Sequence, residues 1–159
     1  MQDRQPARGA RRAREFEQFV AGAAGRLLHA ATLLTAEAPD ANPRARHLLT
    51  LALAHTYARW DRLRGDDPYD CARRHLATRF THTTWHGAFG RARPGPRGPL
   101  AALSPRERLV LVLRLYEGVA EERTAALLGL PAERVHTLCD RAAATVLHPA
   151  RPAPKAAPS

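Results

Sequence analysis

The sequence predicts an all-α protein with two small helical domains, three helices in front and a helix-turn-helix behind, joined by a Gly/Pro-rich linker. Three observations support this fold class. Apolar residues recur at three- and four-residue intervals, no stretch shows sustained period-two alternation, and a run of glycines and prolines at residues 87–99 separates two periodic regions. The chain has 159 residues, 45% of them hydrophobic, which is enough to bury a modest core and argues against wholesale disorder.

The front domain is expected at residues 13–86. Residues 1–12 are polar and arginine-rich and contain a proline and a glycine, which indicates a flexible basic arm. An apolar stripe then runs from Phe16 to Leu34 with the spacing of one long amphipathic helix, and Pro39 follows its end.

Two further helices complete the front domain. The second begins at Pro43, a residue suited to a first helical turn, and continues to Gly65. The third starts at Asp67 and Pro68, an N-cap followed by a proline, and runs towards Trp85. The Gly/Pro-rich run that follows can sustain neither helix nor strand, so we expect it to be the interdomain linker.

The back domain is expected at residues 100–148. A capping box opens it, because Ser104 is a good N-cap and Glu107 stands three residues later. Residues 149–159 are rich in proline and alanine, and we expect a disordered tail there. The helices expected between the capping box and the tail lie at about residues 105–118, 121–128 and 131–147.

The last two of these helices match a helix-turn-helix. Ala125 is small, as required where two helices cross closely, and Gly129 occupies a turn that needs a positive φ. Val135 and Leu138 then point from the second helix into the core. This spacing places the second helix where its exposed side chains can enter a major groove.

The net charge of +10 is concentrated in the front of the chain. Residues 1–98 hold 17 arginines against 9 acidic residues, whereas residues 99–148 hold 6 of each. A basic front and a neutral back favour a polyanion contact that is mainly in the front half.

Several classes of protein are disfavoured by the sequence. The longest apolar run, Leu48–Ala54, is far shorter than the roughly 18–20 residues that span a bilayer, and no secretory signal is apparent. The two cysteines, Cys71 and Cys139, fit a reducing cytosol. We therefore expect a cytoplasmic protein. The sequence offers no glycine-rich phosphate loop, no nucleophile motif and no paired carboxylates in a defensible cleft, so we also expect a protein that is not an enzyme and uses no cofactor.

One cluster of metal-ligating residue types stands on the third helix. Cys71, His75, His82 and His86 share one face of a helical wheel. Four ligands spread along one straight helix cannot close around a single ion, so we expect no metal site.

The chain resembles the extracytoplasmic-function group of sigma-70 factors, most of all its actinobacterial members. The resemblance covers roughly residues 14–148 and depends on the order and spacing of short strings. These strings are Glu15–Val20, Leu33–Thr35, Thr56–Trp60, Asp67–Tyr69 with Arg73 and Arg74, Leu103–Arg108, Leu111–Glu117 and Ala125–Gly129.

The resemblance implies a front domain that binds RNA polymerase core and captures unpaired bases of the promoter −10 element, and a back domain that reads the −35 duplex. Arginines near aromatic residues suit phosphate neutralisation and base stacking, although the alternative is that the aromatics are core and the arginines solvated. The expected front contacts with DNA are Tyr57, Arg59, Trp60, Arg73, Arg74 and Arg79. The expected back contacts are Arg134, His136, Thr137 and Arg141.

Two segments depart from the family pattern. In the recognition helix, Glu133 and Asp140 add negative charge, so we expect weaker DNA binding than a basic helix would give. In the second helix, the family's acidic run and glutamine are replaced by bases and a threonine at residues 44–50. The expected partner-binding residues there are Arg46, His47, Leu49 and Thr50.

The inverted charge of the Arg44–His47 segment leaves a second function open. If the usual surface on polymerase is basic, this basic segment repels it. The alternative is a degenerate sigma-like module that binds a regulatory protein without supporting initiation. An anti-sigma protein is a further partner that the family allows.

Overall fold

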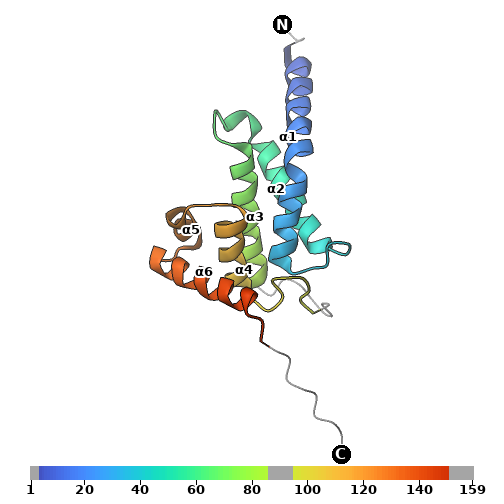
Figure 1. Cartoon of the computed structure of the whole chain (residues 1–159). Coiled ribbons are helices and arrows are strands. Elements are labelled where there is room, and N and C mark those ends of the chain that lie inside the picture. The colour runs from blue at the N-terminus through green and yellow to red at the C-terminus, as the bar shows by residue number, and fades with distance from the viewer. Residues whose placement is uncertain (1–3, 86–94, 151–159) are drawn as a thin grey trace, which may run out of the picture.

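The computed structural model describes residues 4–85 and 95–150, which form an all-helical fold (Figure 1). Within these residues the only β-type pairing is an isolated bridge between Ala38 and Ala41. The predicted fold class, three helices in front and a helix-turn-helix behind, is confirmed. The elements are α1 (Arg4–Thr35), α2 (Pro43–Ala58), the 3-10 turn η1 (Trp60–Arg62), α3 (Pro68–Trp85), α4 (Pro105–Leu111), the π-helical segment η2 (Val112–Tyr116), α5 (Glu121–Leu128) and α6 (Ala132–Leu147).

The front half is a bundle of α1, α2 and α3. Alanines are fully or almost fully buried where these helices meet, and their small side chains let the backbones approach closely. Leu27, Leu34 and Leu48 fill the remaining space and are completely or almost completely shielded from solvent. The buried alanines of the bundle are Ala23, Ala30, Ala31, Ala45, Ala52, Ala72 and Ala77.

The back half is the helix-turn-helix that the sequence predicts. Ser104 and Glu107 form both hydrogen bonds of the capping box that opens α4. Gly129 ends α5 with a φ of 63°. Val135 of α6 is completely buried against the preceding helices. The spacing of small, glycine and apolar residues therefore predicted the local structure correctly.

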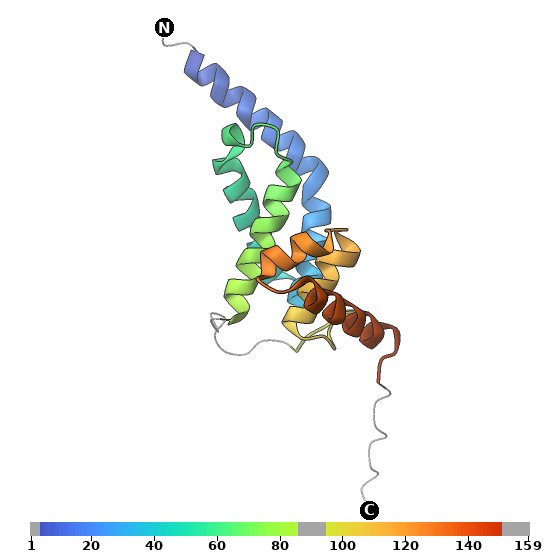
Figure 2. The ribbon, with the colours of Figure 1, turned by 90° about the vertical axis from the view of Figure 1, so that its left-hand side faces the viewer.

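The two halves share a hydrophobic core. Leu100, Leu103 and Val110 of the back half belong to the same buried cluster as Leu34 and Leu48 of the front half. Figure 2 shows α4 to α6 packed against the lower part of the three-helix bundle. The back half is therefore docked on the front half.

Two arginines, Arg97 at the end of the linker and Arg108 of α4, make polar contacts with the end of α1. Arg108 is 7% exposed, and its guanidinium donates to the carbonyl oxygens of Leu34 (2.8 Å) and Leu103 (2.9 Å). The backbone N–H of Arg97 donates to the carbonyl of Ala36. Of the predicted linker, residues 87–94 lie outside the described residues, and residues 95–99 pack beside the end of α1.

The predicted basic arm is wrong for residues 4–12, which are helical and form the first turns of α1. Arginine and alanine favour helix, and a proline is tolerated in a first helical turn. Contacts from Arg12 to α2 and η1 also hold this segment in place. Residues 1–3 of the predicted arm and residues 151–159 of the predicted tail lie outside the described part of the chain.

The second helix is shorter than predicted, because it ends at Ala58 and does not continue to Gly65. Arg64 and Gly65 have positive φ values of 38° and 100°, which an α-helix cannot accommodate. The apolar periodicity does not reveal this change, since Trp60 keeps its packing against α1 from the η1 turn.

None of the helices in the described ranges combines the length and hydropathy needed to cross a membrane.

We predict opposite effects for two Gly→Ala substitutions. Gly129→Ala should lower the free energy of unfolding by about 1 kcal/mol, because a side chain at this left-handed φ is strained. Gly22→Ala, inside α1 with open space around the added Cβ, should raise it by about 0.5 kcal/mol. Urea denaturation of both variants measures the difference, and equal effects of the same sign would contradict the turn geometry.

Candidate nucleic-acid and protein interfaces

Four aromatic side chains gather where α1 meets the end of α2. The ring of Trp60 meets Phe16 edge-on at 5.3 Å and lies 5.5 Å from Phe19. Tyr57 packs on Phe16 at 4.8 Å but stays 38% exposed, with the guanidinium of Arg12 over its ring. Trp60 is thus half-buried within a packed cluster, while Tyr57 retains an accessible face.

A polar hollow of about 360 Å³ opens beside this cluster, between the end of α2, the η1 loop and α3. The rings of His55 and His75 stack in it with centroids 3.9 Å apart and planes 11° from parallel. The other residues that line it are Arg59, Arg62, Leu63, Asp66, Cys71, Arg74 and Thr78.

The two histidines of the hollow are neutral at pH 7. Burial, together with the charges of His55, Arg79 and Arg59, lowers the pKa of His75 to about 4. Burial also lowers the pKa of His55, with a contribution from Arg59. The hollow therefore combines flat, neutral rings with arginines, a combination that can hold both a planar base and a phosphate.

The three remaining front candidates occupy different environments along α3. Arg73 is mostly buried and paired with Asp70 and Glu117, so it serves the interior. Arg74 lies 3.1 Å from Asp70 and keeps a side chain that is 61% exposed. Arg79 is exposed. The structure thus groups Arg59 and Arg74 in the hollow and separates Arg73 from them.

Glu117, which follows η2, joins the two halves. Its side chain is 1% exposed and accepts a hydrogen bond from the Tyr69 hydroxyl at 2.9 Å. Arg73 and Arg26 place guanidinium nitrogens 3.5 and 3.7 Å from its oxygens. Burial, followed by the hydrogen bond and negative charge of Glu117, raises the pKa of Tyr69. A carboxylate of the back half is therefore held by two arginines and a tyrosine of the front half.

Arg26 also contacts the residue before Glu117. It donates to the carbonyl oxygen of Tyr116 at 2.9 Å, and the Tyr116 ring stacks on His29 at 5.2 Å. The sequence reasoning did not select Glu117 or Arg26 as interacting residues, because they are 91 residues apart and no local pattern links them.

The exposed face of α6 carries the predicted recognition residues, and acidic side chains pair with two of them. His136 lies between Glu121 (3.2 Å) and Asp140 (3.3 Å). Arg141 lies 3.3 Å from Glu107. The hydroxyl of Thr137 donates to the backbone of its own helix, while Arg134 is exposed and has no carboxylate partner among the described residues.

The outer face of α2 is basic. Arg46, His47 and Thr50 are exposed, and α2 contains no Asp or Glu. Leu49 instead packs against the second buried cluster of the front half. Arg44 is drawn to Glu37 at 3.2 Å and also donates to the carbonyl of Thr35. The predicted partner surface thus consists of Arg46, His47 and Thr50, while Leu49 supports it from within.

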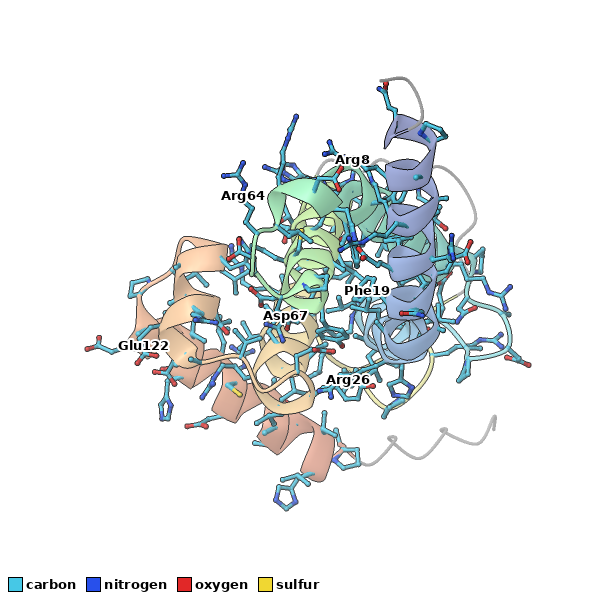
Figure 3. All side chains as sticks on the ribbon, turned by 90° about the horizontal axis from the view of Figure 1, so that it is seen from above. Arg8, Phe19, Arg26, Arg64, Asp67 and Glu122 are labelled. Carbon is cyan, nitrogen blue, oxygen red and sulfur yellow. The ribbon has the colours of Figure 1, made fainter. Side chains whose placement is uncertain are left out.

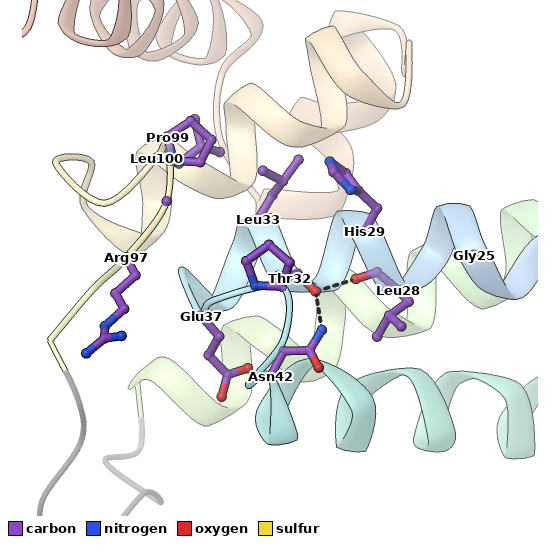
Figure 4. A pocket seen from close by; sticks show the side chains of 12 residues that line it. Gly25, Leu28, His29, Thr32, Leu33, Glu37, Asn42, Arg97, Pro99 and Leu100 are labelled. Atoms are coloured by element: carbon purple, nitrogen blue, oxygen red, sulfur yellow. Dashed lines mark hydrogen bonds between the residues drawn. The ribbon is translucent and has the colours of Figure 1, made fainter.

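A second cavity, of about 270 Å³, lies at the end of α1 (Figure 4). Leu28, Leu33 and Leu100 form apolar walls, and Asn42 donates to the hydroxyl of Thr32 at 2.9 Å. No residue that the sequence singled out as a site lines it.

Among the described residues no three His, Cys, Asp or Glu side chains come together as metal ligands. Of the cluster that the sequence placed on one helix face, His86 lies outside the described residues.

Comparisons with known proteins match the back half to one family and most of the chain to two named relatives. The family described as Sigma-70, region 4 matches residues 100–146. The RNA polymerase sigma-E factor of Streptomyces coelicolor is 30% identical over 150 residues, with 82% of each chain covered. The chain belongs to the sigma-70 family. It is of the extracytoplasmic-function type, as the sequence predicted.

A second sigma-E factor, that of Streptomyces avermitilis, is 29% identical to this sigma-70 family member over 150 residues, again with 82% of each chain covered. No solved structure matches the chain. The identity near 30% is consistent with the departures in α2 and α6 noted above.

We predict that Glu117→Ala lowers the free energy of unfolding by about 3 kcal/mol, since removing one partner of a buried charged pair leaves the others uncompensated. Chemical denaturation measures the loss. The matched control is Glu122→Ala on the exposed face of α5, expected to stay within about 0.5 kcal/mol of the wild type. A small effect at Glu117 would show that the halves are not held by this residue.

We predict that stability falls as the pH drops from about 6.5 towards 4, in part through His75. Its pKa is about 4 in the folded protein and ordinarily 6.5, so protonation favours the unfolded chain over this window. His75→Gln should flatten the dependence. Thermal unfolding of both proteins at a series of pH values tests this, and parallel curves would exclude the contribution of His75.

Proposed function

We propose that the protein is a transcription initiation factor that binds RNA polymerase core and promoter DNA, with the front half at the −10 element and the helix-turn-helix at the −35 element. The observation that carries this proposal is the presence, in one sigma-70 family chain, of a basic hollow fit for an unpaired base and a recognition helix. The relatives are named as RNA polymerase sigma-E factors, which supports the same assignment.

In the front half, the hollow between α2 and α3 accepts the unpaired base. The neutral rings of His55 and His75 offer it stacking and hydrogen-bonding groups. Arg59, Arg62 and Arg74 neutralise the adjoining phosphates. Tyr57 supplies a second aromatic surface beside the hollow, whereas Trp60 acts through packing.

In the back half, Arg134 and Thr137 of α6 make the first contacts with the duplex, because both are exposed and no carboxylate pairs with Arg134 among the described residues. His136 and Arg141 contact DNA only after they leave the carboxylates that now hold them. This competition lowers the affinity of the recognition helix for phosphates.

With the back half docked on the front half, the protein is too small to contact the −10 and −35 elements at the same time. Arg74 of the hollow and Arg123 of α5 line one and the same cavity, so the hollow lies directly beside the helix-turn-helix. The −35 and −10 positions lie about 25 base pairs apart, roughly 85 Å of B-DNA. Residues 86–99 can contribute roughly 48 Å at full extension, and the two halves themselves have to cover the rest. The halves therefore separate, and the contacts of Glu117 break, when both elements are bound.

The outer face of α2 binds the protein partner. Its residues Arg46, His47 and Thr50 favour an acidic surface. If the polymerase surface is basic, the second candidate function applies: a sigma-like module that binds an acidic regulatory protein, such as an anti-sigma protein, without supporting initiation. The lack of any carboxylate on α2 is the observation that favours this second candidate.

Run-off transcription with purified core polymerase tests the proposal. We predict a promoter-specific transcript that depends on the protein. Arg134→Ala should reduce duplex binding and make the slope of log affinity against log salt less steep by about 0.9, the value for one lost phosphate contact. Arg106→Ala, on α4, is the charge-matched control.

Failure to bind core polymerase at low salt would reject initiation and leave the regulatory module. Duplex binding that is unchanged in Arg134→Ala would show that α6 is not the contact with DNA.

A further inference from the structure

The first turns of α1 project beyond the front bundle as a basic helix. Figures 1 and 2 show α1 continuing past the ends of α2 and α3. Residues 5–11 are exposed throughout, and contain no acidic residue. A segment with a proline, a glycine and little apolar area to bury is a weak helix by itself. Its helical form therefore depends on the few contacts that fix it to the bundle.

Arg12 makes those contacts. Its guanidinium donates to the carboxylate of Asp61 at 3.0 Å and to the carbonyl oxygen of Tyr57, and lies 4.4 Å above the Tyr57 ring. This anchor sets α1 against the loop that carries η1. Arg8 stands one turn earlier on the same side of α1, so it projects towards this loop.

The loop adds three exposed arginines to the same end of the molecule, Arg59, Arg62 and Arg64. Arg64 has a φ of 38°, an unusual conformation for a residue other than glycine. Figure 3, which looks down on this end, shows Arg8 extending from α1 towards the loop that carries Arg64. Strained backbone of this kind is retained where the surrounding structure requires it, often at binding sites.

The charge of this surface is strongly unbalanced. Residues 5–17 and 59–64 together hold seven arginines and three acidic residues. Two of those acids are already paired, Glu15 with Arg11 and Asp61 with Arg12. We call the exposed arginines that face this loop or belong to it, Arg8, Arg59, Arg62 and Arg64, the α1–η1 basic surface.

We propose that the α1–η1 basic surface binds the phosphate backbone of the DNA that adjoins the unpaired stretch, beyond the base held in the hollow. Arg59 and Arg62 belong to both the hollow and this surface, so the positive charge is continuous from one to the other. A strand with one base in the hollow can then carry its next phosphates along the loop to Arg64 and Arg8. This proposal rests on the proposed function of the hollow.

Guanidinium groups suit this occupant. They form paired hydrogen bonds with phosphate oxygens, and each neutralised phosphate releases counterions, so binding becomes steeply dependent on salt. The surface offers no apolar pocket and reads no base edges, and its contribution to affinity is therefore independent of sequence.

The test compares Arg8→Gln/Arg64→Gln with wild type on a duplex that contains a short unpaired stretch. Both residues are exposed, so circular dichroism should show an unchanged fold. We expect about tenfold weaker binding at moderate salt and a slope of log affinity against log salt that is less steep by about 1.5, for two lost phosphate contacts. The matched control is Arg97→Gln/Arg106→Gln, with the same charge change away from this surface, expected to bind like wild type.

An unchanged slope in Arg8→Gln/Arg64→Gln, or an equal change in the control, overturns the proposal. The proposal is also overturned if Arg8→Gln/Arg64→Gln loses binding to a polyglutamate peptide but binds DNA like wild type. That result would assign the surface to an acidic protein. A fully paired duplex separates this test from that of the hollow. If wild type binds both DNAs equally while the variant still loses slope, the phosphate surface stands and base capture by the hollow fails.

Discussion

The burial of Glu117 between two arginines and a tyrosine is the interaction on which the arrangement of this sigma-70 family member depends. A carboxylate with 1% exposure is tolerated only when its charge is matched and its oxygens accept hydrogen bonds. Tyr69, Arg73 and Arg26 meet both needs, and all three belong to the front half. The polar contact thereby selects one docking geometry for two halves that the shared apolar core alone would orient less specifically.

The same contact links fold to function. Arg73, by sequence a candidate for DNA, is held in the interior by Glu117 and Asp70. On α6, carboxylates likewise hold His136 and Arg141. In the docked state, acidic residues of the same chain thus pair with several of the basic side chains that the sequence assigned to DNA. The exposed arginines lie elsewhere, around the hollow and on the first turns of α1, which moves the expected phosphate contacts to that end of the molecule.

Much of the fold could be predicted, because its signals are local. The capping box at Ser104, the proline at Pro43 and the left-handed glycine at Gly129 act on the backbone within one turn, so residue type alone is informative. The end of α2 and the helicity of residues 4–12 were missed, since contacts with distant residues decide them. Arg12, for example, holds the start of α1 by reaching Tyr57 and Asp61.

The sequence by itself determined the all-helical class, the helix-turn-helix and the family resemblance, and it placed the charge in the front half. Only the tertiary structure decided which charges are accessible. The sequence does not distinguish a paired arginine from an exposed one. Arg73 pairs with a carboxylate 44 residues away, whereas Arg8 is exposed to solvent. Pairing across the fold depends on distance in space, which periodicity and composition do not encode, and the candidate site could therefore be predicted as a region but not residue by residue.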